Sequence, residues 1–271
     1  MKILRRSDLK IKNDLPYFEF REMAALGWLK HAFLTRMGGT SPPPFDSLNL
    51  SINPGDSEEH VSRNKGRIGE VFGFDLEDLI LLRQIHQDRI LLLKEPHDRL
   101  PADSEYDAVI TDISNRFLGI KTADCLPVLI MDRAKKVIAA IHAGRQGTAL
   151  QVTRKALKMM KRQWGCSYKD LWVALGPSIG SCCYEIDERV FLQEWTPFST
   201  MKEAGKWRID LPRINIAHMK EEGIGEDQIF WIDLCTRCHS DLFFSYRGEG
   251  QTGRQLSFIG IVNTNGVHRW S

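Results

Sequence analysis

The sequence predicts an α+β fold in which layered, mixed β-sheets are flanked by helices. Apolar runs typical of strands occur in clusters, and only a few stretches with helical periodicity lie between them. A doubly wound fold would instead alternate strand and helix regularly along the chain. The 271 residues contain no low-complexity linker and no strong internal repeat, so we expect a single domain over residues 1–271.

The first half of the chain is expected to consist mainly of strands around one helix. An early strand reaches residues 32–34, and the glycines and prolines of residues 37–44 then interrupt regular structure. The helical pattern over residues 57–72 begins at Ser57, whose hydroxyl is a suitable N-cap. Further strands are expected at residues 79–85, 89–93, 106–111, 117–121, 127–131 and 137–141.

The second half is expected to carry the longest helix. A turn containing Gly144 and Gly147 opens a predicted helix over residues 148–164, in which apolar residues recur at helical spacing. A strand at residues 171–175 is ended by the Gly-Pro dipeptide that follows it. We expect further helices at residues 190–195 and 214–222, and late strands at residues 229–234 and 256–261.

The charge balance argues against two classes of partner. The chain has 37 basic and 35 acidic residues, and this net charge of +2 predicts neither a nucleic-acid-binding stripe nor a membrane-binding patch. Residues 1–10 lack the apolar core of a signal peptide, and no apolar run approaches the ~18 residues of a membrane helix. We therefore expect a cytoplasmic protein whose six cysteines stay reduced.

Three polar residues at the ends or breaks of apolar strands form a candidate metal site. Cys125 and His142 each interrupt a buried-looking strand, and His86 directly precedes the apolar run at residues 90–93. Two imidazoles and one thiolate are a three-ligand set for zinc that leaves a fourth position open for water or substrate. The same residues also fit a metal-free hydrolase with Cys125 as nucleophile and His142 as base, or ordinary buried core residues.

The remaining cysteines give a weaker signal. Cys235 and Cys238 form a lone CxxC without a matching second pair, which we interpret as a strand-end pair without function. A redox role and a structural zinc role are the alternatives. Cys182 and Cys183 are adjacent in the chain, so we do not expect both to bind one tetrahedral ion.

Several motifs occur together in an order that resembles a known family. They cover residues 31–262 and resemble the YfiH family, also called polyphenol oxidase or laccase-domain proteins and peptidoglycan editing factors. The motifs are Thr35-Arg36-Met-Gly-Gly39, Gln84-Ile-His86, Thr122-Ala-Asp-Cys-Leu-Pro127, His142-Ala-Gly144, Gly176-Pro-Ser-Ile-Gly180, Cys183-Tyr-Glu185, Phe243-Phe-Ser-Tyr-Arg247 and Thr252-Gly-Arg254.

The resemblance implies a purine nucleoside phosphorylase that also deaminates adenosine, with purine nucleosides and phosphate as its partners. It also implies layered α and β structure and Zn²⁺ held by His86, Cys125 and His142. One motif departs from the family, because Arg145 and Gln146 stand where the family has Trp and Arg. We therefore expect Arg145 to contact substrate in an altered loop. The eight histidines contain no His-x-His step, which argues against multicopper oxidation.

Other charged residues are candidates for substrate binding or catalysis. Arg36, followed by a glycine-rich turn, is expected to bind phosphate or ribose oxygens, although a surface arginine on a turn is the simpler alternative. Asp124 is expected to orient a ligand or to transfer protons, or else to cap the next turn. Arg247 and Arg254 are expected to contact phosphate, or to be solvated loop residues.

Two other functions remain open at this point. A cysteine or zinc amidohydrolase that edits a peptidoglycan precursor would cleave an amide without phosphate. A zinc-stabilised binding protein would hold its metal in a closed four-ligand site and turn over no substrate. The sequence predicts no oligomeric state.

Overall fold

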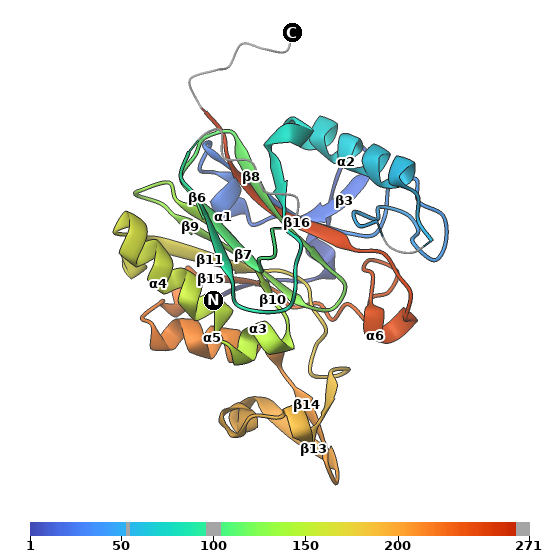
Figure 1. Cartoon of the computed structure of the whole chain (residues 1–271), viewed down its shortest axis with the longest axis vertical. Coiled ribbons are helices and arrows are strands. Elements are labelled where there is room, and N and C mark those ends of the chain that lie inside the picture. Colours follow the sequence, from blue (N-terminus) through green and yellow to red (C-terminus); the bar gives the residue numbers. More distant parts are fainter. Residues whose placement is uncertain (53–54, 96–103, 264–271) are drawn as a thin grey trace.

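A computed structural model describes residues 1–52, 55–95 and 104–263 of the chain (Figure 1). Within these residues the strands form three sheets that combine parallel and antiparallel pairs. The prediction of an α+β fold with layered mixed sheets is confirmed. In the same part of the chain, no helix combines the length and the apolar character needed to cross a membrane.

The large sheet has the strand order β1-β15-β11-β9-β10-β7-β6. Its side chains alternate between two faces, as pleated strands require. Along β9, Val128 and Ile130 pack with the helices, whereas Leu129 and Met131 face the other main sheet. The strands are β1 (Lys2–Leu4), β15 (Ile229–Ile232), β11 (Leu171–Leu175), β9 (Leu126–Asp132), β10 (Ile138–Ala143), β7 (Ala108–Thr111) and β6 (Ile90–Leu93).

The second sheet has the order β2-β3-β4-β16-β8-β5. Helix α2 (Glu58–Phe72) covers its outer face through Ile68, Val71 and Phe72. Ser57 caps this helix as predicted, because its hydroxyl accepts a hydrogen bond from the backbone amide of His60. The strands are β2 (Lys10–Lys12), β3 (Leu15–Phe18), β4 (Leu29–Leu34), β16 (Gln255–Ile261), β8 (Arg116–Thr122) and β5 (Leu79–Leu81).

The two main sheets pack face to face between outer layers of helix. Figure 1 shows α2 on one side of the sheets and α3 to α5 on the other. Apolar side chains from both sheets fill the space between them, and burying each large one contributes about 1.5–3 kcal/mol. The outer helices are α3 (Arg145–Ala149), α4 (Val152–Trp164) and α5 (Leu211–Glu221).

Several elements differ from the sequence prediction. The helix expected at residues 148–164 is divided into α3 and α4 because Gln151 adopts a left-handed conformation with φ of 60°. The helix expected at residues 190–195 is instead two 3₁₀ turns, Glu188–Val190 and Gln193–Phe198, the second of which contains a proline. The sequence did not predict the small sheet that follows, which consists of β12 (Glu185–Asp187), β14 (Lys206–Ile209) and β13 (Ser199–Glu203).

Candidate metal centre and its cavity

Strand register places His142 beside a buried carboxylate. Strand β10 is antiparallel to β7, with Ile141 opposite Ala108, so His142 lies level with Asp107. Val109 and Ala140 face the second sheet. Asp107 and His142 each lie two residues from one of them, so their side chains point toward the same face. His142 Nδ1 lies 2.7 Å from Asp107 Oδ1, and both side chains are buried.

Cys125 reaches the same place because the chain crosses there from one main sheet to the other. It lies in the bend between β8 of the second sheet and β9 of the large sheet. Leu126, which follows it, pairs with Ala143 on β10. The cysteine therefore lies next to the end of the strand that carries His142.

His86 lies in the loop after β5, in a left-handed backbone conformation with φ of 61°. The carboxylate of Asp107 holds this loop, since it accepts hydrogen bonds from the amides of His86 at 2.9 Å and Gln87 at 2.6 Å. The rings of His86 and His142 meet edge to face with their centroids 4.8 Å apart. One buried carboxylate thus orients the His142 imidazole and holds the backbone of the His86 loop, and its bond to the ring is typical of carboxylate–histidine–metal arrangements.

The three side chains fit a metal ion in donor chemistry and in space. One ligand atom from each of His86, Cys125 and His142 lies within 4.8 Å of the other two. Gly144 leaves the room between them, because a Cβ there would lie 3.0 Å from Cys125 Sγ and 3.4 Å from His86 Cδ2. We refer to these three residues as the metal centre. Their donor set, two imidazoles and one thiolate, suits zinc with an open coordination position.

Charge coupling favours the ionised thiol within the metal centre. Burial alone would raise the pKa of Cys125, but the imidazoles of His142 and His86 lower it to about 6. Burial would lower the pKa of His142, but Cys125 and Asp107 raise it to about 9. Without a metal, these shifts favour a thiolate–imidazolium pair of Cys125 and His142, and a divalent cation bound by both residues would displace the imidazolium proton. The same pair also suits a nucleophilic cysteine.

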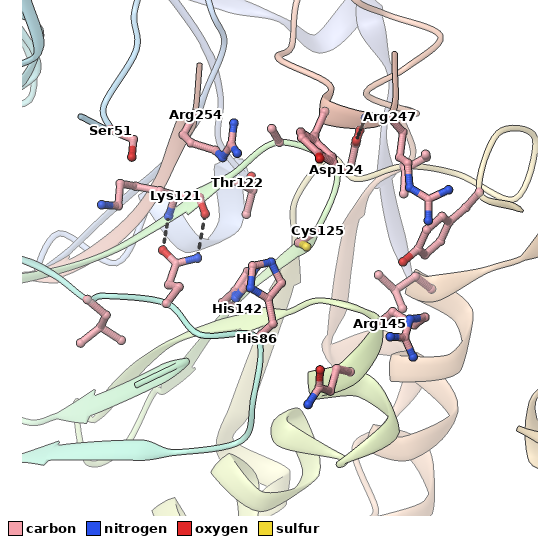
Figure 2. Close-up of a pocket in the computed structure, with 18 of the residues that line it drawn as sticks. Ser51, His86, Lys121, Thr122, Asp124, Cys125, His142, Arg145, Arg247 and Arg254 are labelled. Atoms are coloured by element: carbon pink, nitrogen blue, oxygen red, sulfur yellow. Dashed lines mark hydrogen bonds between the residues drawn. The ribbon is translucent and has the colours of Figure 1, made fainter. Parts of the chain in front are cut away.

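The metal centre borders a cavity of about 600 Å³, a size typical of small-molecule sites (Figure 2). Among the described residues, its lining has one carboxylate, Asp124, and five basic side chains. Figure 2 shows Lys121 and Arg254 on one side of Cys125, and Arg145 and Arg247 on the other. The cavity is therefore suited to an anionic or strongly polar ligand. The basic residues are Arg83, Lys121, Arg145, Arg247 and Arg254.

The cavity brings together most of the substrate-binding residues predicted from the sequence. Arg145 begins α3 and lines the cavity together with Gln146, so both residues that depart from the family motif face the ligand space. Arg247 lies over the Tyr184 ring at 5.1 Å and donates to the carbonyl of Glu185. Arg254 donates to two neighbouring loop carbonyls.

Asp124 also lines the cavity, but hydrogen bonds already occupy its carboxylate. Oδ1 accepts from the hydroxyls of Thr236 at 2.6 Å and Ser245 at 2.7 Å, and Oδ2 accepts from the amide of Arg247 at 2.7 Å. Its backbone is left-handed with φ of 95°. This geometry holds the loops around the cavity together and matches an orienting residue better than a proton donor.

Arg36 lies outside the cavity lining. Its Nε donates to the Asp46 carbonyl at 2.8 Å, and its Nη1 donates to the Ser240 carbonyl at 2.9 Å and to Glu249. The guanidinium also lies 4.6 Å from the centroid of the Phe244 ring. Protein groups therefore hold Arg36, which links the loop after β4 to α6 (Tyr246–Glu249).

Two residues of the site were missed in the sequence. Asp107 begins an apolar segment, and a carboxylate at that point was the only signal for its role. Lys121 lies near the end of β8, directly before the Thr122-Ala-Asp-Cys motif, and its backbone is fixed by paired hydrogen bonds with Gln84 (Figure 2). Burial lowers the pKa of Lys121, and the nearby charges of Lys65 and Arg254 lower it further.

The prediction that Cys235 and Cys238 have no matching second pair of cysteines is wrong. The structure places Cys182 and Cys183 beside Cys235 and Cys238, with the four sulfur atoms within 4.8 Å of one another. Adjacent cysteines can face one point here because residues 181–183 form a turn rather than a strand.

Comparison with known proteins gives relatives over nearly the whole chain. Purine nucleoside phosphorylase YlmD of Bacillus subtilis is 32% identical over 243 residues, covering 84% of this chain and 87% of YlmD. The crystal structure of YfiH from Bacillus licheniformis has a TM-score of 0.84 at 33% identity, covering 92% of this chain and 96% of that one. The structure of YlmD from Geobacillus stearothermophilus has a TM-score of 0.86 at 27% identity, covering 94% and 99% of the two chains.

A sequence model of one protein family also matches. It is described as multi-copper polyphenol oxidoreductase laccase, and it matches residues 30–262. These residues include the metal centre and all the basic residues of the cavity. The chain therefore belongs to this laccase-like family, which is the family that its sequence motifs resemble.

Proposed function

We propose that the protein is a zinc-dependent purine nucleoside phosphorylase that also deaminates adenosine. The observation that carries this proposal is a strongly basic cavity bordered by two histidines and one cysteine, in a chain whose relatives are named purine nucleoside phosphorylases. We also propose that residues 1–271 act as one catalytic domain. In support, the metal centre takes its residues from a loop of the second sheet, a strand of the large sheet and the link between them.

His86, Cys125 and His142 would hold the zinc. When bound, zinc would supply Lewis acidity for the hydrolytic loss of the purine amino group. Asp107 keeps the ring of His142 oriented and holds the His86 loop by its amides. The donor set also occurs in mononuclear copper sites, but multicopper oxidation needs further clusters of imidazoles. Within the described residues, no such histidine cluster accompanies the metal centre.

Lys121 and Arg254 are the best candidates to bind phosphate. They lie on one side of Cys125, and their like charges lie close enough to lower the pKa of Lys121 (Figure 2). A phosphate bound between Lys121 and Arg254 would offset the repulsion between their positive charges. It would then attack the anomeric carbon of the ribose as the bond to the purine breaks. On the opposite side, Arg145 and Arg247 would contact the nucleoside, in the altered loop and beside Tyr184.

The first test measures phosphate-dependent release of purine base from inosine and adenosine. Zinc and copper in the purified protein are determined at the same time. Cys125→Ala should lose the zinc of the metal centre and reduce base release by about 10³-fold or more, because Lewis-acid stabilisation contributes several kcal/mol. Cys166→Ala is the matched control, since this cysteine is buried outside the metal centre. Full activity in Cys125→Ala would refute the assignment.

A second comparison separates the two candidate phosphate sites. Lys121→Ala should raise KM for phosphate and slow phosphorolysis more than deamination. Arg36→Ala should slow both reactions to the same extent if Arg36 only holds loops, as its protein contacts suggest. A selective loss of phosphorolysis in Arg36→Ala, as first expected from the sequence, would return the phosphate role to Arg36.

The thiolate–imidazolium pair supports one alternative function. With Cys125 as nucleophile and His142 as base, the same cavity would suit a cysteine amidohydrolase acting on a peptidoglycan precursor. Such an enzyme would be active without metal and would not respond to phosphate. Metal-independent cleavage of an amide in a peptidoglycan precursor, without base release from nucleosides, would favour this alternative.

A further inference from the structure

Four cysteines form a second cluster outside the lining of the cavity. Its sulfur atoms all lie within 4.8 Å of one another. Cys238 Sγ lies 3.5 Å from Cys182 Sγ and 3.4 Å from Cys183 Sγ. We refer to Cys182, Cys183, Cys235 and Cys238 as the four-cysteine cluster.

These distances suit four sulfurs around one ion. At a zinc–sulfur distance of about 2.3 Å, the edges of a sulfur tetrahedron are about 3.8 Å long. A disulfide requires sulfurs only about 2.05 Å apart, and the cysteines are free thiols in the structure. The CxxC spacing of Cys235 and Cys238 is also that of structural zinc sites.

Two parallel strands of the large sheet bring the cysteines together. Strands β11 and β15 are parallel neighbours, and an isolated bridge between Ser178 and Cys235 extends their pairing. The chain then turns after Gly180, which places Cys182 and Cys183 beside the CxxC segment. A Cβ at Gly180 would lie 3.3 Å from Cys235 Cβ and 3.4 Å from Cys182 Sγ, so the turn packs tightly against the cluster.

Backbone amides contact one sulfur of the cluster. Burial raises the pKa of Cys235, but the amides of Gly180 and Cys238 act on its sulfur and lower the pKa overall. The Gly180 amide donates to it at 3.2 Å. Burial raises the pKa of Cys183 to about 11, and the neighbouring Cys238 and Cys235 add to this increase.

We propose that the four-cysteine cluster binds a structural Zn²⁺ ion in a closed, four-thiolate site. Binding would release the thiol protons, and all four coordination positions would be filled by sulfur. Zinc is favoured over harder cations because thiolates are soft ligands. Nothing in this site would remain open for a substrate.

Such an ion would fix one wall of the cavity. Tyr184, which lines the cavity, directly follows Cys183 in the chain. Thr236, which follows Cys235, donates to the Asp124 carboxylate at 2.6 Å. The amide of Ile179 donates to the Asp124 carbonyl at 2.9 Å. A zinc ion here would tie the segments that carry these residues to each other.

The test counts zinc in full-length chains that lack a ligand at the metal centre. Cys125→Ala is compared with Cys125→Ala/Cys182→Ser, Cys125→Ala/Cys238→Ser and the control Cys125→Ala/Cys166→Ala. All are produced with added zinc, freed of affinity tags and kept away from chelators. Cys125→Ala and the control should retain about one zinc per chain. The other two should lose it by about tenfold or more, because a thiolate ligand is missing.

Two outcomes would overturn the proposal. One is the absence of zinc in Cys125→Ala, and the other is equal zinc in all four proteins. A cobalt spectrum keeps the test valid if the serine variants fail to fold. Cobalt-loaded Cys125→Ala should give intense tetrahedral bands with sulfur-to-cobalt charge transfer, whereas weak bands without charge transfer would refute a thiolate site. The outcome is independent of the reaction at the cavity, since the cluster lies outside its lining.

Discussion

The metal centre and the four-cysteine cluster differ in their donors and in their surroundings. The metal centre combines two imidazoles with one thiolate, and it borders a cavity of about 600 Å³. The four-cysteine cluster offers sulfur alone, and it lies where two loops meet outside that cavity. Catalytic zinc typically has three protein ligands and an open coordination position beside a cavity. Structural zinc typically has four protein ligands and no open position.

The two regions also differ in what holds their ligands. A buried carboxylate, Asp107, orients the His142 ring and holds the loop of His86 through its backbone amide. In the four-cysteine cluster, a backbone amide serves instead, since Gly180 donates directly to Cys235 Sγ. The same kind of ion would therefore be held by a side-chain network at the metal centre and partly by the main chain at the four-cysteine cluster.

Asp107→Asn should have the largest effect. The amide side chain cannot accept both the His142 proton and the loop amides as the carboxylate does. Loss of such an orienting partner typically weakens metal binding by about 10–100-fold. Chelator competition should therefore show weaker zinc binding at the metal centre and unchanged binding at the four-cysteine cluster. Equal weakening at both places would mean that the substitution disturbs the fold instead.

The ligand residues of the metal centre are easier to recognise in the sequence than Asp107, which holds the His142 ring and the His86 loop. The ligands stand out in a local pattern, whereas the role of Asp107 depends on residues far away in the chain. Cys125 and His142 are polar residues at breaks in apolar strands, and such breaks are visible locally. Asp107 acquires its role through the register of β7 against β10, which no local pattern reveals. The sheet layers were predictable from clustered strands, but the division of one helix at Gln151 was not, because a single left-handed residue causes it.

Contacts between residues far apart in the sequence also explain why the surroundings of Arg36 and of the four cysteines were not predicted. The partners of Arg36 include Ser240 and Glu249, which are more than 200 positions away in the sequence. The local Arg-Met-Gly-Gly pattern suggested an open anion site, whereas these distant groups hold the guanidinium. Likewise, Cys183 and Cys238 are 55 positions apart, and only the parallel pairing of β11 with β15 brings them together.

Thiol reactivity should separate the two regions in the metal-free protein. The pKa of Cys125 is lowered to about 6, whereas that of Cys183 is raised to about 11. At pH 7 the thiolate fraction of Cys125 should exceed that of an ordinary thiol by about thirtyfold, partly offset by lower nucleophilicity. Its alkylation rate should rise with pH through about 6 and then level off. Peptide mass spectrometry after iodoacetamide treatment would measure both sites.

Two results would contradict this difference. Alkylation of Cys125 that rises only near pH 8.5, like a free thiol, would mean that His142 does not stabilise its thiolate. Faster alkylation of Cys183 than of Cys125 at pH 7 would mean that the four-cysteine cluster holds the more acidic thiols. Added zinc should protect Cys125 if the ion binds at the metal centre.

The smallest effects should come from adding one methyl group beside each region. In Gly144→Ala the new Cβ would lie 3.0 Å from Cys125 Sγ, a ligand that must keep its position. In Gly180→Ala the nearest atom is Cys235 Cβ at 3.3 Å, so a smaller shift relieves the contact. Gly144 has an ordinary φ of −72°, so the backbone there adds no strain. We expect zinc affinity to fall severalfold in Gly144→Ala and less in Gly180→Ala, measured by chelator competition. A larger loss in Gly180→Ala would mean that the closed site, rather than the open one, tolerates less displacement of its sulfurs.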